Sequence, residues 1–238
     1  MLELLNNVTH KDLRINTRRG AQWGDAQMSC PVTIDEFTRL QAHYPIVFQQ
    51  NGPGSFLPIV LFGLKDGENV YLDGERWDAG YLPLAMRRMP FSIGVDKGTD
   101  EMRMMVDMAS PRIAAVGEEG EAVFRPHGGN TDYLEEANAV LLTLHEGLQA
   151  TPAFVEALVR HELLEPFVLD VPQPDGSHGR LQGLHMIHEE RLAALDGGTV
   201  ALLHGADYLR PIYMAIASLS NLNPLIERHL ARATQAAS

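Results

Sequence analysis

The chain has 238 residues, 45% of them hydrophobic, which is enough apolar material for one large domain or two small ones with a sizeable core. Asp and Glu number 31 against 19 Lys and Arg, and the resulting formal net charge of −12 disfavours general electrostatic binding to nucleic acid or anionic lipid. The single cysteine, Cys30, excludes an intrachain disulfide and a cysteine-rich zinc site.

The N-terminal sequence MLELLNNVTHKDLRIN has neither the basic segment nor the long apolar segment of a secretory signal peptide. No window of the chain approaches about 18 consecutive apolar residues, and the longest apolar neighbourhood, FLPIVLFGL, has the length of a strand. We therefore expect a soluble, cytoplasmic protein without a transmembrane segment.

The first half of the chain predicts short helices and strands. In VTIDEFTRLQAHYP, Thr33 and Glu36 have the spacing of a capping box and apolar residues recur every three positions, which predicts a short helix. PIVFQ, LPIVLFGL and VYLD follow as the strands of a hairpin or meander. Pro83 and Pro90 bracket a short helical segment, and further short strands are expected at SIGV, EMRMMVD, RIAAV and EAVFR.

Helical periodicity dominates the second half. TDYLEEANAVLLTLHEGL repeats Leu and Ala at helical spacing, and Asp132 near its start suits a helix N-terminus. TPAFVEALVRHELL is predicted to be a second, separate helix, with Thr151 as its N-cap and Pro152 as its first helical residue. FVLDV and RLQGLHMI predict strands, HEERLAAL predicts a short helix, and residues 200 to 233 are expected to be mostly helical.

One series of elements occurs twice in the chain. A helix, a strand that starts at a proline, a Gly/Pro loop and a strand that ends in L-x-G-L recur about 120 residues later. The match is gapped and has few identities, so chance similarity stays open as the alternative. We predict an α+β fold of short mixed or antiparallel sheets with helices. If the repeat is real, the fold contains an αββα-like unit twice; if the similarity is due to chance, it contains no such duplication. We expect a β-rich N-terminal half at 1–130 and an α-rich C-terminal half at 131–238, packed as one domain.

Three blocks of the sequence form an ordered series: HYPIVF at 43–48, GLKDGENVYLDGERWDAGYLPLAMRRMPF at 63–91, and GLHMIHEERLAAL followed by YLRPIYMAIASLSNLNPLIER. Together these blocks resemble the bacterial SapC family. None of these blocks is a catalytic signature, so the resemblance implies a biological context instead of a reaction. The family is associated with a crystalline surface layer, and its members occur beside TonB-dependent receptors, flavin-dependent halogenases and cupin-like oxygenases. A surface-layer structural role is therefore one implied function, although we find no export signal.

The segment HMIHEE is the candidate metal site. Its residues His185, His188 and Glu189 have side chains that bind transition metals, and two histidines three apart share one face of a helix. The alternative is that His185 ends a strand while His188 and Glu189 start a helix, because strand residues an odd number apart point to opposite faces. Phosphate-loop, dinucleotide-binding and G-x-S-x-G motifs are missing from the sequence. We predict no cofactor and no catalytic residue, and keep a metal-dependent enzyme as an alternative.

The segment DGERWDAGYLPLAMRRMPF is the stronger candidate for a binding site. Trp77 and Tyr81 present large faces with a polar group, and Arg87 and Arg88 carry fork-shaped donors for a carboxylate, phosphate or peptide group. The structural alternative is that the aromatic residues belong to the core and the arginines pair with neighbouring carboxylates. We predict a non-catalytic binding or accessory protein linked to surface uptake or modification systems. Its expected partner is a peptide, an acidic small molecule or a protein of such a system, and not nucleic acid.

Overall fold

The structure, a computed structural model, describes residues 1–95, 101–115, 117–172 and 178–237. It contains two compact units, and each unit is built from segments that are far apart in the sequence. The first unit consists of Met1–Ala26, Leu72–Asp78 and Leu84–Glu146, and the second consists of Gln27–Tyr71, Ala79–Pro83 and Gly147–Ser238.

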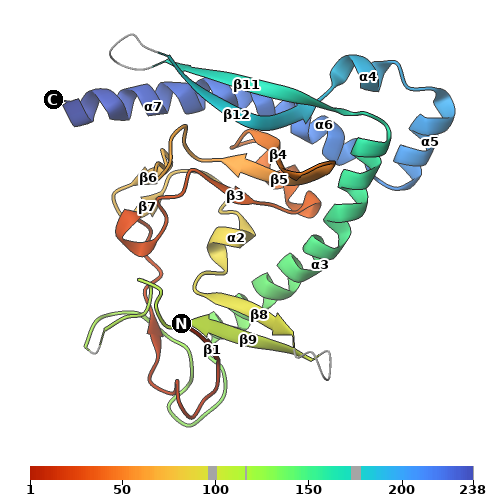
Figure 1. Ribbon diagram of the computed structural model, residues 1–238. Coiled ribbons are helices and arrows are strands. Elements are labelled where there is room, and N and C mark those ends of the chain that lie inside the picture. The colour runs from red at the N-terminus through yellow and green to blue at the C-terminus, as the bar shows by residue number, and fades with distance from the viewer. Residues whose placement is uncertain (96–100, 116, 173–177, 238) are drawn as a thin grey trace. The chain divides into compact units, whose positions relative to one another are not determined.

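The structure combines helices with several antiparallel sheets, so the predicted α+β class is confirmed (Figure 1). The α-helices are α1 Phe37–Leu40, α2 Leu84–Arg87, α3 Asp132–Arg160, α4 Glu189–Ala193, α5 Gly197–Gly205, α6 Leu209–Ser218 and α7 Leu222–Ala237. The 3-10 helices are η1 Ala21–Trp23, η2 Ile34–Glu36 and η3 Leu219–Asn221. The strands are β1 Leu2–Leu4, β2 Arg14–Ile15, β3 Ser29–Pro31, β4 Ile46–Gly52, β5 Ser55–Leu61, β6 Leu72–Asp73, β7 Arg76–Trp77, β8 Phe91–Val95, β9 Met102–Asp107, β10 Glu121–Ala122, β11 Leu164–Pro172 and β12 His178–Ile187.

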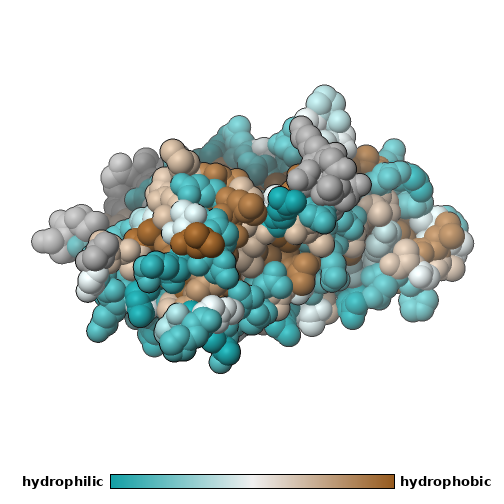
Figure 2. Space-filling view, turned by 90° about the horizontal axis from the view of Figure 1, so that it is seen from below, coloured by the Kyte–Doolittle hydropathy of each residue, from teal (hydrophilic) through white to brown (hydrophobic). Residues whose placement is uncertain are grey.

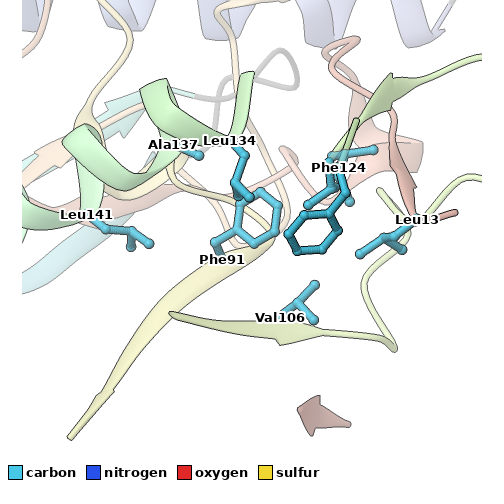
Figure 3. Packing of buried hydrophobic residues seen from close by; sticks show 9 residues of the cluster. Leu13, Phe91, Val106, Phe124, Leu134, Ala137 and Leu141 are labelled. Atoms are coloured by element: carbon cyan, nitrogen blue, oxygen red, sulfur yellow. The ribbon is translucent and has the colours of Figure 1, made fainter. Parts of the chain in front are cut away.

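The first unit is built on a three-stranded antiparallel sheet in the order β1–β9–β8. Phe91 of β8 and Val106 of β9 are cross-strand partners, and both are fully buried. Figure 3 shows the core around them, in which side chains from the sheet, from the start of α3 and from loop segments meet, namely Leu13, Phe91, Val106, Phe124, Leu134, Ala137 and Leu141. Each large apolar side chain buried in this way contributes about 1.5–3 kcal/mol to folding.

The second unit is built on a five-stranded antiparallel sheet in the order β11–β12–β4–β5–β3. Two antiparallel strand pairs, the predicted hairpin β4–β5 and the pair β11–β12, are joined in this sheet where Leu184 of β12 pairs with Gln49 of β4. Phe154 of α3 is fully buried and meets Phe37 edge-on, with ring centroids 6.1 Å apart. The order of these elements is confirmed, while the duplication and the division at residue 130 stay predictions.

The predicted capping box is present in the second unit. The Thr33 N–H donates to Glu36 Oε2 at 3.1 Å, and the Thr33 side chain accepts from the Glu36 backbone, so η2 starts where the sequence indicates. Gly147 of α3 lies against this cap. A Cβ at residue 147 would lie 2.6 Å from the Thr33 Cβ, so only glycine allows the close approach.

The structure corrects the prediction of two separate helices in the segment after residue 130. Thr151 and Pro152 lie inside one continuous helix, α3. The Thr151 hydroxyl donates to the Gly147 carbonyl at 2.7 Å and accepts from the Ile34 N–H at 3.3 Å, which holds the helix at this point. Proline removes one backbone donor from a helix interior. Buried packing beyond it, by residues such as Leu158, compensates for that loss.

Two predicted strands are also revised. VYLD contributes only β6, which pairs with β7 and not with the β4–β5 hairpin, because the chain turns back within four residues. In RIAAV, Ile113 forms an isolated bridge with Ile15 instead of a strand, and Val116 lies outside the described residues. EAVFR contributes the short strand β10.

The surface combines a hydrophilic majority with apolar patches. Figure 2 shows hydrophobic residues lying among hydrophilic ones on one face of the molecule. In the described part of the chain, no helix is both long enough and apolar enough to cross a membrane. Isolated exposed apolar residues are normal on a folded protein, so they do not by themselves indicate a binding face.

Candidate functional site

The structure divides the predicted binding residues between the two units. Trp77, Arg87 and Arg88 belong to the first unit and Tyr81 belongs to the second. Trp77 is half-buried on β7, opposite Leu72 of β6. Arg88 Nη1 donates to a backbone carbonyl at the start of β8 at 2.7 Å, which connects the end of α2 to that strand. Trp77 and Arg88 thus have contacts within the fold.

Tyr81 also has structural contacts in the second unit. Its hydroxyl donates to Glu36 Oε1 at 3.2 Å, and its carbonyl accepts from the Tyr44 hydroxyl. The Arg39 guanidinium lies over its ring, 5.6 Å from the centroid. Because Glu36 is also the capping-box residue, Tyr81 supports the start of η2.

Arg87 differs from the other three because it lines a pocket. The pocket has a volume of about 430 Å³, and all of its lining residues belong to the first unit. They come from the segment after β2, from α2 and its C-terminal end, from the segment between β9 and β10, from β10, and from the N-terminal turns of α3. The ionisable residues among them are Arg19, Arg87, Arg112, Glu121, Asp132, Tyr133 and Glu136.

A buried ion pair supports the end of this pocket that Arg112 and Arg19 line. Arg112 Nη2 lies 2.6 Å from Asp25 Oδ1, and both side chains are 1% exposed. Arg112 Nη1 donates to the carbonyls of Asn16 and Arg18, at 3.2 and 2.9 Å. Arg19 Nη1 approaches the same Asp25 oxygen at 3.5 Å. Two guanidinium groups therefore share one carboxylate, and this end of the pocket keeps a net positive charge in a protein that is acidic overall.

One buried hydrogen-bond donor at the pocket, the Nε–H of Arg112, has no acceptor among the described residues. Tyr133 also lines the pocket, and its hydroxyl can donate a further hydrogen bond. Leaving a buried donor unsatisfied costs about 1–3 kcal/mol, and more when the group is charged. An acceptor oxygen supplied by a ligand would remove that cost at the place where the pocket is positively charged.

Burial shifts two groups that line the pocket. It lowers the pKa of Arg19, with the Arg112 guanidinium as the second cause, while Asp25 acts in the opposite direction. Burial raises the pKa of Tyr133 to about 12, although both arginines act to lower it. Arginine stays protonated at neutral pH, and a tyrosine with this pKa stays neutral. The pocket therefore offers donors whose protonation does not change near pH 7.

The HMIHEE residues have structural roles in the second unit. His185 meets Phe56 edge-on, with ring centroids 4.7 Å apart, and burial lowers its pKa. His188 Nδ1 accepts from the Arg191 N–H at 3.4 Å and caps α4, with Glu189 in the first turn. The helix start at His188 and Glu189 is thus confirmed. Within residues 1–95, 101–115, 117–172 and 178–237, no group of three His, Cys, Asp or Glu side chains could hold a metal ion, and the metal hypothesis stays a prediction.

Sequence reasoning identified Arg87 and missed the other donors of the pocket. Arg19, Arg112 and Tyr133 lie in three separate segments and share no local motif. The one available signal was Arg112 itself, a charged residue between a proline and the apolar IAAV. A buried arginine requires compensation, so such a position predicts a partner elsewhere in the chain without identifying it.

Comparison with known proteins gives one match. The family model SapC matches residues 5–225 of this chain. That range includes every residue that lines the pocket. Searches of curated proteins and of solved structures found no similar protein.

Proposed function

The chain belongs to the SapC family, and we propose that it is a non-catalytic binding protein that holds the acidic group of a small molecule or peptide in the pocket of its first unit. One observation carries this proposal. The Arg112 side chain is 1% exposed and lines the pocket, and its Nε–H has no acceptor among the described residues.

The chemistry of the pocket favours an anionic group with several oxygen acceptors. Carboxylates and phosphates accept charge-assisted hydrogen bonds from guanidinium groups, and these bonds are about twice as strong as neutral ones. Arg19 and Arg112 supply the positive charge, and the Tyr133 hydroxyl supplies a neutral donor. The two guanidinium groups are already fixed by contacts with Asp25 and with backbone carbonyls, so binding would order few side chains.

The size of the pocket supports ligand binding, and the state of Tyr133 does not suit general acid–base catalysis. A volume of about 430 Å³ lies in the range of roughly 300–1,000 Å³ that is typical of small-molecule sites. General acid–base catalysis requires a group whose pKa lies near the working pH. The Tyr133 hydroxyl, with its pKa raised to about 12, is far from that condition at neutral pH.

The biological role that we propose follows from the family. SapC-like proteins are associated with cell-surface uptake or modification systems, so an accessory role in such a system fits a protein that binds a ligand without transforming it. The ligand would be a peptide or a small acid handled by that system.

The proposal is tested by thermal unfolding of the full chain in sodium phosphate and in sodium succinate, with sodium chloride at equal ionic strength as the reference. The wild type should be stabilised by at least one of the two anions, because each supplies acceptors for Arg112 and Tyr133. Arg19→Gln should weaken this binding about tenfold or more, since it removes one charge-assisted donor.

Arg103→Gln is the matched control, because Arg103 is an exposed arginine of β9 that does not line the pocket. It should bind both anions as the wild type does. The proposal fails if neither anion stabilises the wild type beyond sodium chloride. It also fails if Arg19→Gln binds as tightly as Arg103→Gln.

A further inference from the structure

We infer that the ligand of this pocket is a small zwitterion that carries both a carboxylate and an ammonium group, as a free α-amino acid does. This inference rests on the proposed function and narrows the class of ligand. It follows from how positive and negative side chains are distributed around one small pocket.

Both signs of charge line the pocket in equal number. The cationic residues are Arg19, Arg87 and Arg112, and the acidic residues are Glu121, Asp132 and Glu136. A ligand with a single sign of charge would be attracted by one set and repelled by the other. A ligand with one positive and one negative group can match both.

Pairing within the protein leaves one positive end and one carboxylate. Arg87 pairs with Glu136, and Asp132 pairs with Arg125 at 2.9 Å. Glu121, by contrast, has no ion pair with any residue that the structure describes. The remaining charges are thus the net positive charge of Arg19 and Arg112, which share one carboxylate, and the carboxylate of Glu121.

The backbone connects the segments that carry these opposite charges. Glu121 of β10 pairs with Ile15 of β2. The next residue, Asn16, donates its backbone N–H to the Arg112 carbonyl at 2.8 Å. Two consecutive backbone positions therefore connect Glu121 to Arg112, so the carboxylate and the guanidinium line the same pocket from adjoining segments.

The surroundings of Tyr133 support this closeness. Arg112 and Arg19 act to lower the pKa of its hydroxyl, whereas Glu121 and Glu136 act to raise it. The hydroxyl thus lies within range of both kinds of charge. A ligand small enough for a pocket of about 430 Å³ can contact the guanidinium groups with its carboxylate and Glu121 with its ammonium group.

The test compares L-amino acids with the carboxylic acids that lack only the amino group, for example L-alanine with propionate, by calorimetric titration of the full chain. The best-binding amino acid should bind at least about tenfold more tightly than its amino-free counterpart, because a hydrogen bond between charged groups is added. Glu121→Gln should abolish this preference, and it should raise the affinity for the amino-free acid or leave it no weaker, because it removes a carboxylate that repels that acid. Glu121→Asp, which keeps the charge, should retain part of it.

Glu119→Gln is the matched control, since Glu119 is an exposed residue of the same segment and does not line the pocket. It should keep the full preference. Equal affinity for an amino acid and its amino-free acid would overturn the zwitterion inference, and so would a preference that survives Glu121→Gln. In either case, the proposed function still holds if the amino-free acids bind and Arg19→Gln weakens their binding. Absence of binding by both kinds of ligand would overturn the proposed function as well.

Discussion

Replacing Asp25 with asparagine should lower the free energy of unfolding by about 3–5 kcal/mol, the usual cost of breaking a buried ion pair by removing one partner. Asp25 is 1% exposed and lies 2.6 Å from an Arg112 nitrogen, and Arg19 approaches it at 3.5 Å. Asparagine has nearly the same shape, so the change leaves no cavity. It leaves two guanidinium groups without their shared carboxylate in a site where water does not compensate for them.

The control is Asp73→Asn, which makes the same chemical change in an exposed pair. Asp73 lies 2.9 Å from an Arg76 nitrogen, and these side chains are 68% and 70% exposed, so the loss should be under about 1 kcal/mol. Urea unfolding followed by tryptophan fluorescence is a suitable assay, because both tryptophans, Trp23 and Trp77, belong to the first unit. If Asp25→Asn costs no more than Asp73→Asn, the ion pair does not hold the pocket wall and the reasoning is refuted.

Three further predictions concern ionisation and packing. Tyr71 and Tyr133 should ionise near pH 12 instead of 10, so their contribution to stability is complete below pH 10 and is lost as the pH rises towards 12. In an ultraviolet titration, Tyr133→Phe should remove one tyrosine from those that ionise near pH 12, and an unchanged amplitude there would contradict this expectation. Burial lowers the pKa of His185 below 6.5, so the unfolded state binds a proton at this residue before the folded state does. Stability should therefore fall as the pH drops below 6.5. The fall should be smaller in His185→Gln, and equal pH profiles of the two proteins would contradict this expectation. Gly147→Ala should cost about 1–3 kcal/mol in urea unfolding, because its Cβ would lie 2.6 Å from that of Thr33, and an unchanged midpoint would argue against this contact.

Local signals in the sequence predicted local structure well. The capping box of Thr33 and Glu36 and the helix start at His188 depend on residues three or four positions apart, and both are present. The break predicted at Pro152 was wrong for the opposite reason. Tertiary contacts of α3, including the Thr151 hydroxyl and buried apolar side chains on the following turns, outweigh a local helix-breaking preference.

Most of the residues that line the pocket could not be predicted from the sequence. Arg87 was singled out because it adjoins an aromatic segment, but the groups that distinguish the pocket are Arg19, Arg112 and Tyr133. They come together only when β10 pairs with β2 and the backbone N–H of the residue after β2, Asn16, donates to the Arg112 carbonyl. No periodicity or spacing within one segment encodes that arrangement.

The most direct test of the account observes Arg112 itself. In a 15N-labelled full chain, the Nε–H resonance of Arg112, identified by through-bond assignment, is followed during titration with the tightest-binding member of the carboxylate and amino acid panel. The account predicts that this resonance shifts and saturates with the binding curve, because the ligand supplies the acceptor that Nε–H lacks among the described residues. A ligand that saturates the protein while the Arg112 resonance stays at its free position would contradict the central claim.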